Sequence, residues 1–190
     1  KKVPLFSQIS IFSSFFDNLK YQENGYLDFN FVVNNWINLQ KEINKKAKKV
    51  RFFKTHSARG VINNKFFTDE TVCLGFIYIV RDPRDVAISW SKHLGTTIDK
   101  AIEIMLFDNN FVTSAEKIYE PVCTWQNHLD SWINFNNISR LVIKYEDMMK
   151  DVGRILDQLI EFLNNIAGIK ISINNNLTTN VLQSTSFHRL

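Results

Sequence analysis

Three short groups of polar residues in this chain have the types and spacing that anion chemistry requires. The first group holds Lys54 and His56, the second holds Arg81 and Ser89, and the third begins at Tyr145. Lysine and arginine bind anions, and imidazole is a base whose pKa lies near working pH. Facing one crevice, such groups would bind a multiply charged anion and deprotonate an acceptor hydroxyl. That chemistry is the transfer of a phosphoryl-like group.

Each of these groups follows a short apolar stretch that predicts a β-strand. The stretches are residues 50–55, 74–80 and 140–145. Helical patterns alternate with them, which indicates a parallel sheet with right-handed crossovers. The carboxyl ends of parallel strands lie on one edge of a sheet, where ligands bind. We therefore predict an α/β fold in which the three polar groups converge.

The stretch from residue 74 to residue 94 organises this prediction. Residues 74–80 carry no charge, as is typical of a strand covered on both faces. Asp82 is a good N-cap residue and Pro83 suits the first position of a helix. Ser89 lies seven residues after that cap, about two helical turns along, so it faces roughly the same way as Asp82. Arg81, the helix start and the Ser89 hydroxyl outline an anion site.

Apolar residues repeat at helical spacing in four stretches, which are residues 30–46, 90–107, 113–135 and 148–163. Gly95 should interrupt the second, and Pro121 should kink or divide the third. Asp147 can cap the fourth. The tryptophans and the histidine at positions 125, 128 and 132 read as packing and hydrogen-bonding residues, not as catalytic ones.

The composition indicates one packed globular domain over residues 1–190. Hydrophobic residues make up 45% of the chain and the net charge is +4. This small excess fits an anionic small ligand and no nucleic-acid partner, since the lysine-rich residues 41–49 read as a solvated helix end. Oligomeric state leaves no signal in the sequence.

Cysteine usage and hydropathy favour a cytoplasmic protein. Cys73 and Cys123 lack metal-like spacing and read as thiols in a reducing compartment. No window is long and apolar enough for a transmembrane helix, so we expect no membrane insertion. No set of histidines, cysteines and carboxylates has metal-ligand spacing, so we expect no catalytic metal.

The motifs together resemble the sulfotransferases that use 3′-phosphoadenosine-5′-phosphosulfate (PAPS), close to the cytosolic and bacterial aryl or alcohol type. Residues 54–56 match the family's K-T-H, and residues 77–89, IYIVRDPRDVAIS, match its 3′-phosphate motif. Residues 125–132 match W-x-x-H-x-x-S-W, followed by Y-E-D, F-L and, at residues 185–187, T-S-F. The resemblance covers about residues 50–188, with the motifs in the family's order.

The resemblance implies a three-layer α/β fold with a central parallel sheet, like that of P-loop nucleotide kinases. It implies sulfuryl transfer from PAPS to a hydroxyl or amine of a small-molecule acceptor, leaving adenosine 3′,5′-bisphosphate. His56 would be the general base and Lys54 would stabilise charge on the transferring group. Arg81 and Ser89 would hold the 3′-phosphate. The adenine pocket would be lined by Tyr145, Thr185 and Phe187.

Two family segments do not occur in these 190 residues. They are the phosphosulfate-binding loop of the form P-K-S-G-T-T-W and the basic R-K-G-x-x-G segment after T-S-F. We therefore expect a domain that is incomplete at both ends, and poor PAPS binding by these residues alone. Two alternatives stay open: a non-catalytic nucleotide-binding module that lost the loop, and a P-loop-type phosphotransferase.

Overall fold

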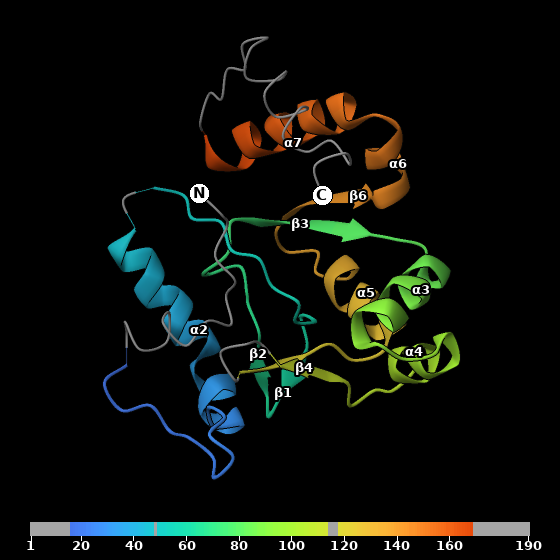
Figure 1. Ribbon diagram of the computed structural model, residues 1–190. Coiled ribbons are helices and arrows are strands. Elements are labelled where there is room, and N and C mark those ends of the chain that lie inside the picture. The colour runs from blue at the N-terminus through green and yellow to red at the C-terminus, as the bar shows by residue number, and fades with distance from the viewer. Residues whose placement is uncertain (1–15, 48, 114–117, 169–190) are drawn as a thin grey trace. The chain divides into compact units, whose positions relative to one another are not determined.

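The computed structural model describes residues 16–47, 49–113 and 118–168, and Figure 1 shows their helices and strands. The chain divides into two compact units. The first comprises the described residues within 1–73 and 82–137, and the second those within 74–81 and 138–190. No helix in these described ranges is both long and apolar enough to cross a membrane.

Helix α2 (Phe29–Lys46) is the longest helix described in the first unit, and it confirms the helix predicted there. Asp28 caps it by accepting a hydrogen bond from the Phe31 amide at 2.7 Å. One face is buried, consisting of Val32, Val33, Trp36, Leu39 and Ile43. Lys45 and Lys46 lie in the last turn, where cations favour the helix dipole. The lysine-rich stretch is therefore a helix end, as predicted.

Aromatic side chains join α2 to a short hairpin and to helix α5 (Trp125–Ile133). The hairpin pairs β1 (Val61–Ile62) with β2 (Lys65–Phe66). Its turn residues both have positive φ, as a tight hairpin turn requires. Trp36 and Phe67 meet edge to face with ring centroids 5.5 Å apart, and Phe67 and Trp132 do so at 6.2 Å. This contact series forms the core beside the segment that carries His56.

Helices α3 (Pro83–Leu94) and α4 (Ile98–Met105) pack against each other and follow the prediction closely. The Asp82 side chain accepts the Arg84 amide at 2.9 Å, and Pro83 is the first helical residue. Gly95 ends α3 in the left-handed conformation, with φ 63°. The predicted cap, proline start and glycine break are all confirmed.

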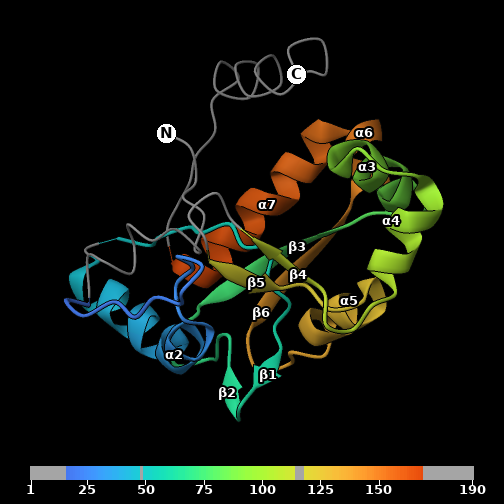
Figure 2. The same ribbon diagram turned by 60° about the horizontal axis from the view of Figure 1, so that its bottom comes forward.

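The helix predicted over residues 113–135, which Pro121 was expected to kink or divide, is confirmed only over Trp125–Ile133 and is wrong before it. Strands β4 (Phe111–Thr113) and β5 (Tyr119–Pro121) form an antiparallel pair, and α5 begins only at Trp125 (Figure 2). Thr124 caps α5 by accepting the Asn127 amide at 3.0 Å. Pro121 lies at the end of a strand, a position that tolerates its missing N–H, instead of kinking a helix.

The strand predicted over residues 50–55 is also absent from the described part of the chain. Lys54 occupies only an isolated bridge position, and the residues around it are irregular. Arg51 and Phe52 are exposed, so no continuous buried face organises this stretch as a sheet strand. The segment that carries Lys54 and His56 is therefore held by other means.

In the second unit, β3 (Gly75–Val80) pairs in parallel with β6 (Ser139–Lys144). This pairing confirms the predicted α/β class. The register runs from Gly75 opposite Ser139 to Val80 opposite Lys144. Helices α6 (Tyr145–Lys150) and α7 (Val152–Ala167) follow β6, and Figure 1 shows α7 running beside the strand pair. The break between them corrects the single helix predicted from residue 148.

Asp151, and not Asp147, is the aspartate that caps a helix here. Its side chain accepts the Arg154 amide at 2.9 Å at the start of α7. Asp147 instead lies in the first turn of α6, where a carboxylate favours the helix dipole. The sequence correctly predicted an aspartate cap in this region, but the capping residue lies four positions further along the chain.

Helix α7 meets β3 at the beginning of the strand. A Cβ added at Gly75 would lie 2.8 Å from the Ser139 carbonyl oxygen and 3.2–3.3 Å from the side chains of Ile166 and Phe162. Further along the same strand face, Ile77 and Ile79 are 37% and 54% exposed. The prediction that both faces of this strand are covered is therefore wrong for the described residues, because α7 covers only one end.

Candidate active site

Residues 54–59 form an irregular segment whose backbone is fixed on one side by strand β5. The His56 amide donates to Oε2 of Glu120 at 3.1 Å, and the Ala58 amide donates to the Pro121 carbonyl at 2.7 Å. Glu120 is only 2% exposed. Main-chain and side-chain acceptors of β5 thus take the place of a sheet partner for this segment.

Helix α5 fixes the other side of the same segment. The indole Nε1 of Trp132 donates to the Ser57 carbonyl at 3.2 Å. Nε2 of His128 lies 3.2 Å from the His56 carbonyl oxygen. Because a carbonyl can only accept, Nε2 carries the proton of a neutral His128. This confirms that Trp132 and His128 act in packing and hydrogen bonding.

Arg59 completes the attachment of the segment to α5. Its amide donates to Oγ of Ser131 at 3.0 Å. Its guanidinium carbon lies 3.6 Å from the ring centroid of Phe135 and 5.1 Å from that of Phe66. Cation–π contacts of this kind stabilise a desolvated guanidinium. The segment is thereby attached to its neighbours at each residue from 56 to 59.

His56 is an exposed residue on this fixed backbone segment, although neighbouring protein atoms cover part of it. Its pKa is lowered, chiefly because neighbouring protein atoms desolvate the ring. The Glu120 carboxylate acts in the opposite direction and raises that pKa, while the nearby Lys54 ammonium lowers it. His56 is therefore neutral near pH 7 and able to accept a proton. Lys54 is exposed beside it.

Arg81 and Tyr145 lie together at the strand ends of the second unit. Each comes directly after the last paired residues of β3 and β6, Val80 and Lys144. The guanidinium carbon of Arg81 is 4.6 Å from the Tyr145 ring centroid. The parallel register explains this contact. Val80 is paired with Lys144, so the residue that follows each of them lies at the same edge of the strand pair. An anion and a planar ring could both be bound there.

Of the remaining predicted site residues, Ser89 lies exposed on α3 in the first unit. Thr185 and Phe187 lie outside the described residues. The structure thus brings together Lys54 with His56, and Arg81 with Tyr145, each pair within its own unit.

Comparison with known families gives one match over nearly the whole chain. The family model described as "Sulfotransferase domain" matches residues 5–190. The chain belongs to the sulfotransferase family. The resemblance carried by the K-T-H, Arg-to-Ser and W-x-x-H-x-x-S-W motifs is thereby confirmed at the level of the family.

Curated sulfotransferases match at low identity over most of this chain. Sulfotransferase 2A6 of Rattus norvegicus is 28% identical, over 62% of this chain and 40% of its own length. Sulfotransferase 1E1 of Mus musculus is 29% identical, over 77% of this chain and 46% of its own length. The chain therefore spans less than half the length of these two relatives.

A solved structure supports the same fold. The mouse sulfotransferase SULT7A1, in complex with PAP, matches 78% of this chain with a TM-score of 0.57 and 26% identity. The match covers 50% of that structure. The α/β architecture of this sulfotransferase chain is thus shared with an experimentally solved member of the family.

Three residues around His56 of this sulfotransferase were not predicted as site residues: Glu120, Ser131 and Arg59. Glu120 was hidden because its stretch was read as part of a helix. Pro121 followed by a Thr124 cap was the signal that could have placed a strand end there. Ser131 belonged to a recognised motif, but its bond to a loop 72 residues away is invisible in sequence.

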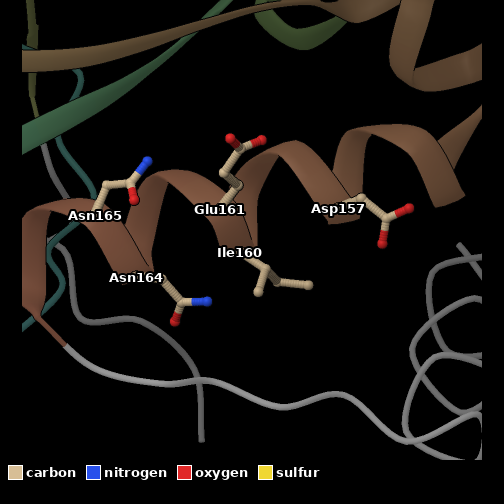
Figure 3. Close-up of a pocket in the computed structure, with 5 residues that line it drawn as sticks. All are labelled: Asp157, Ile160, Glu161, Asn164 and Asn165. Carbon is tan, nitrogen blue, oxygen red and sulfur yellow. The ribbon is translucent and has the colours of Figure 1, made fainter.

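A separate hollow of about 390 Å³ lies along α7 (Figure 3). Its described lining consists of Asp157, Ile160, Glu161, Asn164 and Asn165, all on that helix. None of the predicted site residues that the structure describes lines it. Among residues 16–47, 49–113 and 118–168, no three histidine, cysteine or acidic side chains gather as metal ligands.

Proposed function

We propose that the complete protein transfers a sulfuryl group from PAPS to a hydroxyl or amine of a small-molecule acceptor, with His56 as the general base. Membership of the sulfotransferase family supports the reaction class. The observation that carries the proposal is the exposed position of His56, whose backbone is bonded to Glu120 and His128. The pKa of its imidazole is lowered at this position. A neutral imidazole carried by a fixed backbone segment meets the requirements of a base.

His56 would accept the acceptor's proton as the acceptor atom attacks sulfur. The bond from sulfur to the phosphate oxygen breaks, and adenosine 3′,5′-bisphosphate leaves with its electron pair. Lys54 lies two residues from His56, and its ammonium already acts on that imidazole. We assign Lys54 the role of stabilising negative charge on the transferring group. PAPS supplies the activated sulfuryl group, and these side chains supply the base and the charge.

Arg81 and Tyr145 fit the nucleotide end of PAPS. A guanidinium suits a phosphate and an aromatic ring suits adenine, and the two groups are 4.6 Å apart. We propose that Arg81 and the Ser89 hydroxyl bind the 3′-phosphate, while Tyr145 contacts adenine together with Thr185 and Phe187. The mouse structure with PAP supports a bisphosphate as the nucleotide product.

The test compares two alanine variants of the complete protein. His56→Ala should lower the rate of transfer from radiolabelled PAPS by about 100-fold or more, since general bases contribute that much. Its affinity for adenosine 3′,5′-bisphosphate, measured by calorimetry, should stay near the wild-type value. Arg81→Ala should instead weaken bisphosphate binding by about 10-fold or more, because it removes a charged hydrogen-bond donor.

Three results would contradict the proposal. Loss of bisphosphate binding in His56→Ala would make His56 a structural residue. Binding of ATP but not of the bisphosphate would favour a phosphotransferase. A wild-type protein that binds the bisphosphate and transfers nothing to a panel of phenols, alcohols and amines would be a nucleotide-binding module.

A further inference from the structure

Glu120 is a buried carboxylate that adjoins the segment carrying His56. Strand β5 pairs with β4 on one side, with Glu120 opposite Val112. Along the segment from residue 56 to residue 58, the Ala58 amide donates to the Pro121 carbonyl and the His56 amide donates to Oε2 of Glu120. At 2% exposure, the Glu120 side chain is almost completely removed from water.

A charge at this position is not needed to hold the backbone. A neutral glutamine oxygen could accept the same amide hydrogen bond, whereas burying an ionised carboxylate is costly. What only the carboxylate adds is a negative field at the His56 ring. Three charged or titratable groups interact electrostatically with that ring: Glu120 from β5, Lys54 from the same segment and His128 from α5.

These three groups do not act in the same direction. Glu120 favours the imidazolium form of His56, and Lys54 disfavours it. His128 is itself kept neutral chiefly by burial, and it bonds to the His56 carbonyl. Among the carboxylates that the structure describes, Glu120 is therefore the one that opposes the effect of desolvation on the pKa of His56. A base that must become positively charged during the reaction needs such a counter-charge.

We propose that Glu120 is a positioning residue for the transfer reaction, fixing the His56 backbone and facing the imidazolium that forms when His56 takes the acceptor's proton. This inference rests on the proposed function, because it assumes that His56 is the base. In that step the acceptor's O–H or N–H bond breaks, an N–H bond forms on His56, and the positive charge is created close to Glu120.

The direct test is an NMR titration of His56 in the full chain. Glu120→Gln keeps an acceptor for the His56 amide and removes only the charge. Removing a negative charge disfavours the imidazolium, so the pKa of His56 should fall, by about 0.5–1 unit. The matched control is Glu103→Gln on α4, whose carboxylate pairs with Lys100 at the surface. An unchanged His56 pKa in Glu120→Gln, or an equal shift in the control, overturns the proposal.

A second measurement avoids any risk that Glu120→Gln fails to fold. In the otherwise unaltered chain with carbon-13-labelled glutamate, the Glu120 carboxyl carbon should respond at the pH at which His56 titrates. His56→Gln, at an exposed position, should abolish that response. If the chemical shift of the Glu120 carboxyl carbon does not change as His56 titrates, the proposal is overturned.

Kinetics of the complete protein then link the pair to catalysis. Glu120→Gln should lower kcat by about 10-fold with little change in the KM of the acceptor, and should move the acidic limb of the pH profile of kcat/KM to lower pH. An unaltered kcat and pH profile overturns the positioning role. The NMR titrations require neither PAPS nor acceptor, so their outcome is separate from failure of the proposed sulfuryl transfer.

Discussion

The candidate site residues fall into two halves, one in each unit, and the two halves are positioned by different physical means. Arg81 and Tyr145 follow the paired ends of β3 and β6, so a regular parallel register places them. Lys54 and His56 lie on an irregular segment that is held by single hydrogen bonds, most of them to side chains of β5 and α5 and one to the Pro121 carbonyl. One half depends on repeated backbone pairing, and the other depends mainly on individual side-chain hydrogen bonds.

This difference predicts how each half responds to mutation. In the strand pair, several adjacent backbone hydrogen bonds hold β3 against β6. Only a change that separates these strands or moves α7 away from them should therefore displace Arg81. Around His56, the removal of one side chain leaves a buried backbone group without a partner, which is costly. The segment carrying the proposed base should therefore be the more sensitive half to single substitutions.

The largest effect is expected for Trp132→Ala, at the centre of the contacts around the His56 segment. It removes the indole bond to the Ser57 carbonyl and the edge-to-face contact with Phe67. We expect a loss of about 3–5 kcal/mol in the free energy of unfolding, measured by urea titration. Amide exchange should accelerate at residues 56–59 and not at residues 76–80.

Trp132→Phe is the matched control, because it keeps most of the aromatic packing and removes the N–H donor. It should cost about 1 kcal/mol. Equal acceleration of amide exchange in both units of the Trp132→Ala chain would contradict the proposed difference between them.

Gly75→Ala tests the other half and should have a smaller effect. The added Cβ would lie 2.8 Å from the Ser139 carbonyl oxygen, a backbone atom that cannot move independently of the strand pair. Overpacking of this kind costs about 1–3 kcal/mol, which urea unfolding can measure. Amide exchange should rise in β3 and β6 and stay unchanged at residues 56–59.

The chain offers a matched control in Gly60→Ala. A Cβ at Gly60 meets nothing within 4 Å. That substitution should be neutral, or stabilise the chain by about 0.4–1 kcal/mol through a less flexible unfolded state. If Gly75→Ala were as harmless as Gly60→Ala, the close packing of β3, β6 and α7 would be wrong.

The sequence predicted the regular half far better than the irregular half. The apolar run before Arg81, the Asp82-Pro83 start and the apolar run before Tyr145 are local signals, and the structure confirms the elements they predict. The supports of His56 are contacts between residues 64–75 positions apart. No local periodicity encodes such contacts, so Glu120 could not be found by that route.

The helix predicted over residues 113–135 shows why the sequence did not reveal Glu120. Apolar spacing fits a helix there, and Pro121 was expected to kink or divide it. The structure places a strand end at Pro121 and a helix cap at Thr124. Two boundary signals in four residues outweigh helical spacing, because a proline removes a hydrogen bond while a cap supplies one.

The smallest effect is expected at Asp82, the surface cap that follows Arg81. Asp82 accepts hydrogen bonds from the Arg84 guanidinium and from the Arg84 amide. The pKa of Asp82 is lowered to about 2, and the guanidinium bonds are the largest cause. Asp82→Asn keeps a capping oxygen and removes the charge. Because the folded pKa is depressed, the stabilisation is fully present above the ordinary carboxyl pKa of 3.8 and is lost as the pH falls through about 2.

The melting temperature of Asp82→Asn should therefore lie slightly below that of the wild type from pH 7 to about pH 4, and the difference should shrink at lower pH. Asp99→Asn, in the first turn of α4, is the matched control, since Thr97 provides the cap of that helix. A melting difference that is constant down to pH 3 would mean that the Asp82–Arg84 bonds do not stabilise α3.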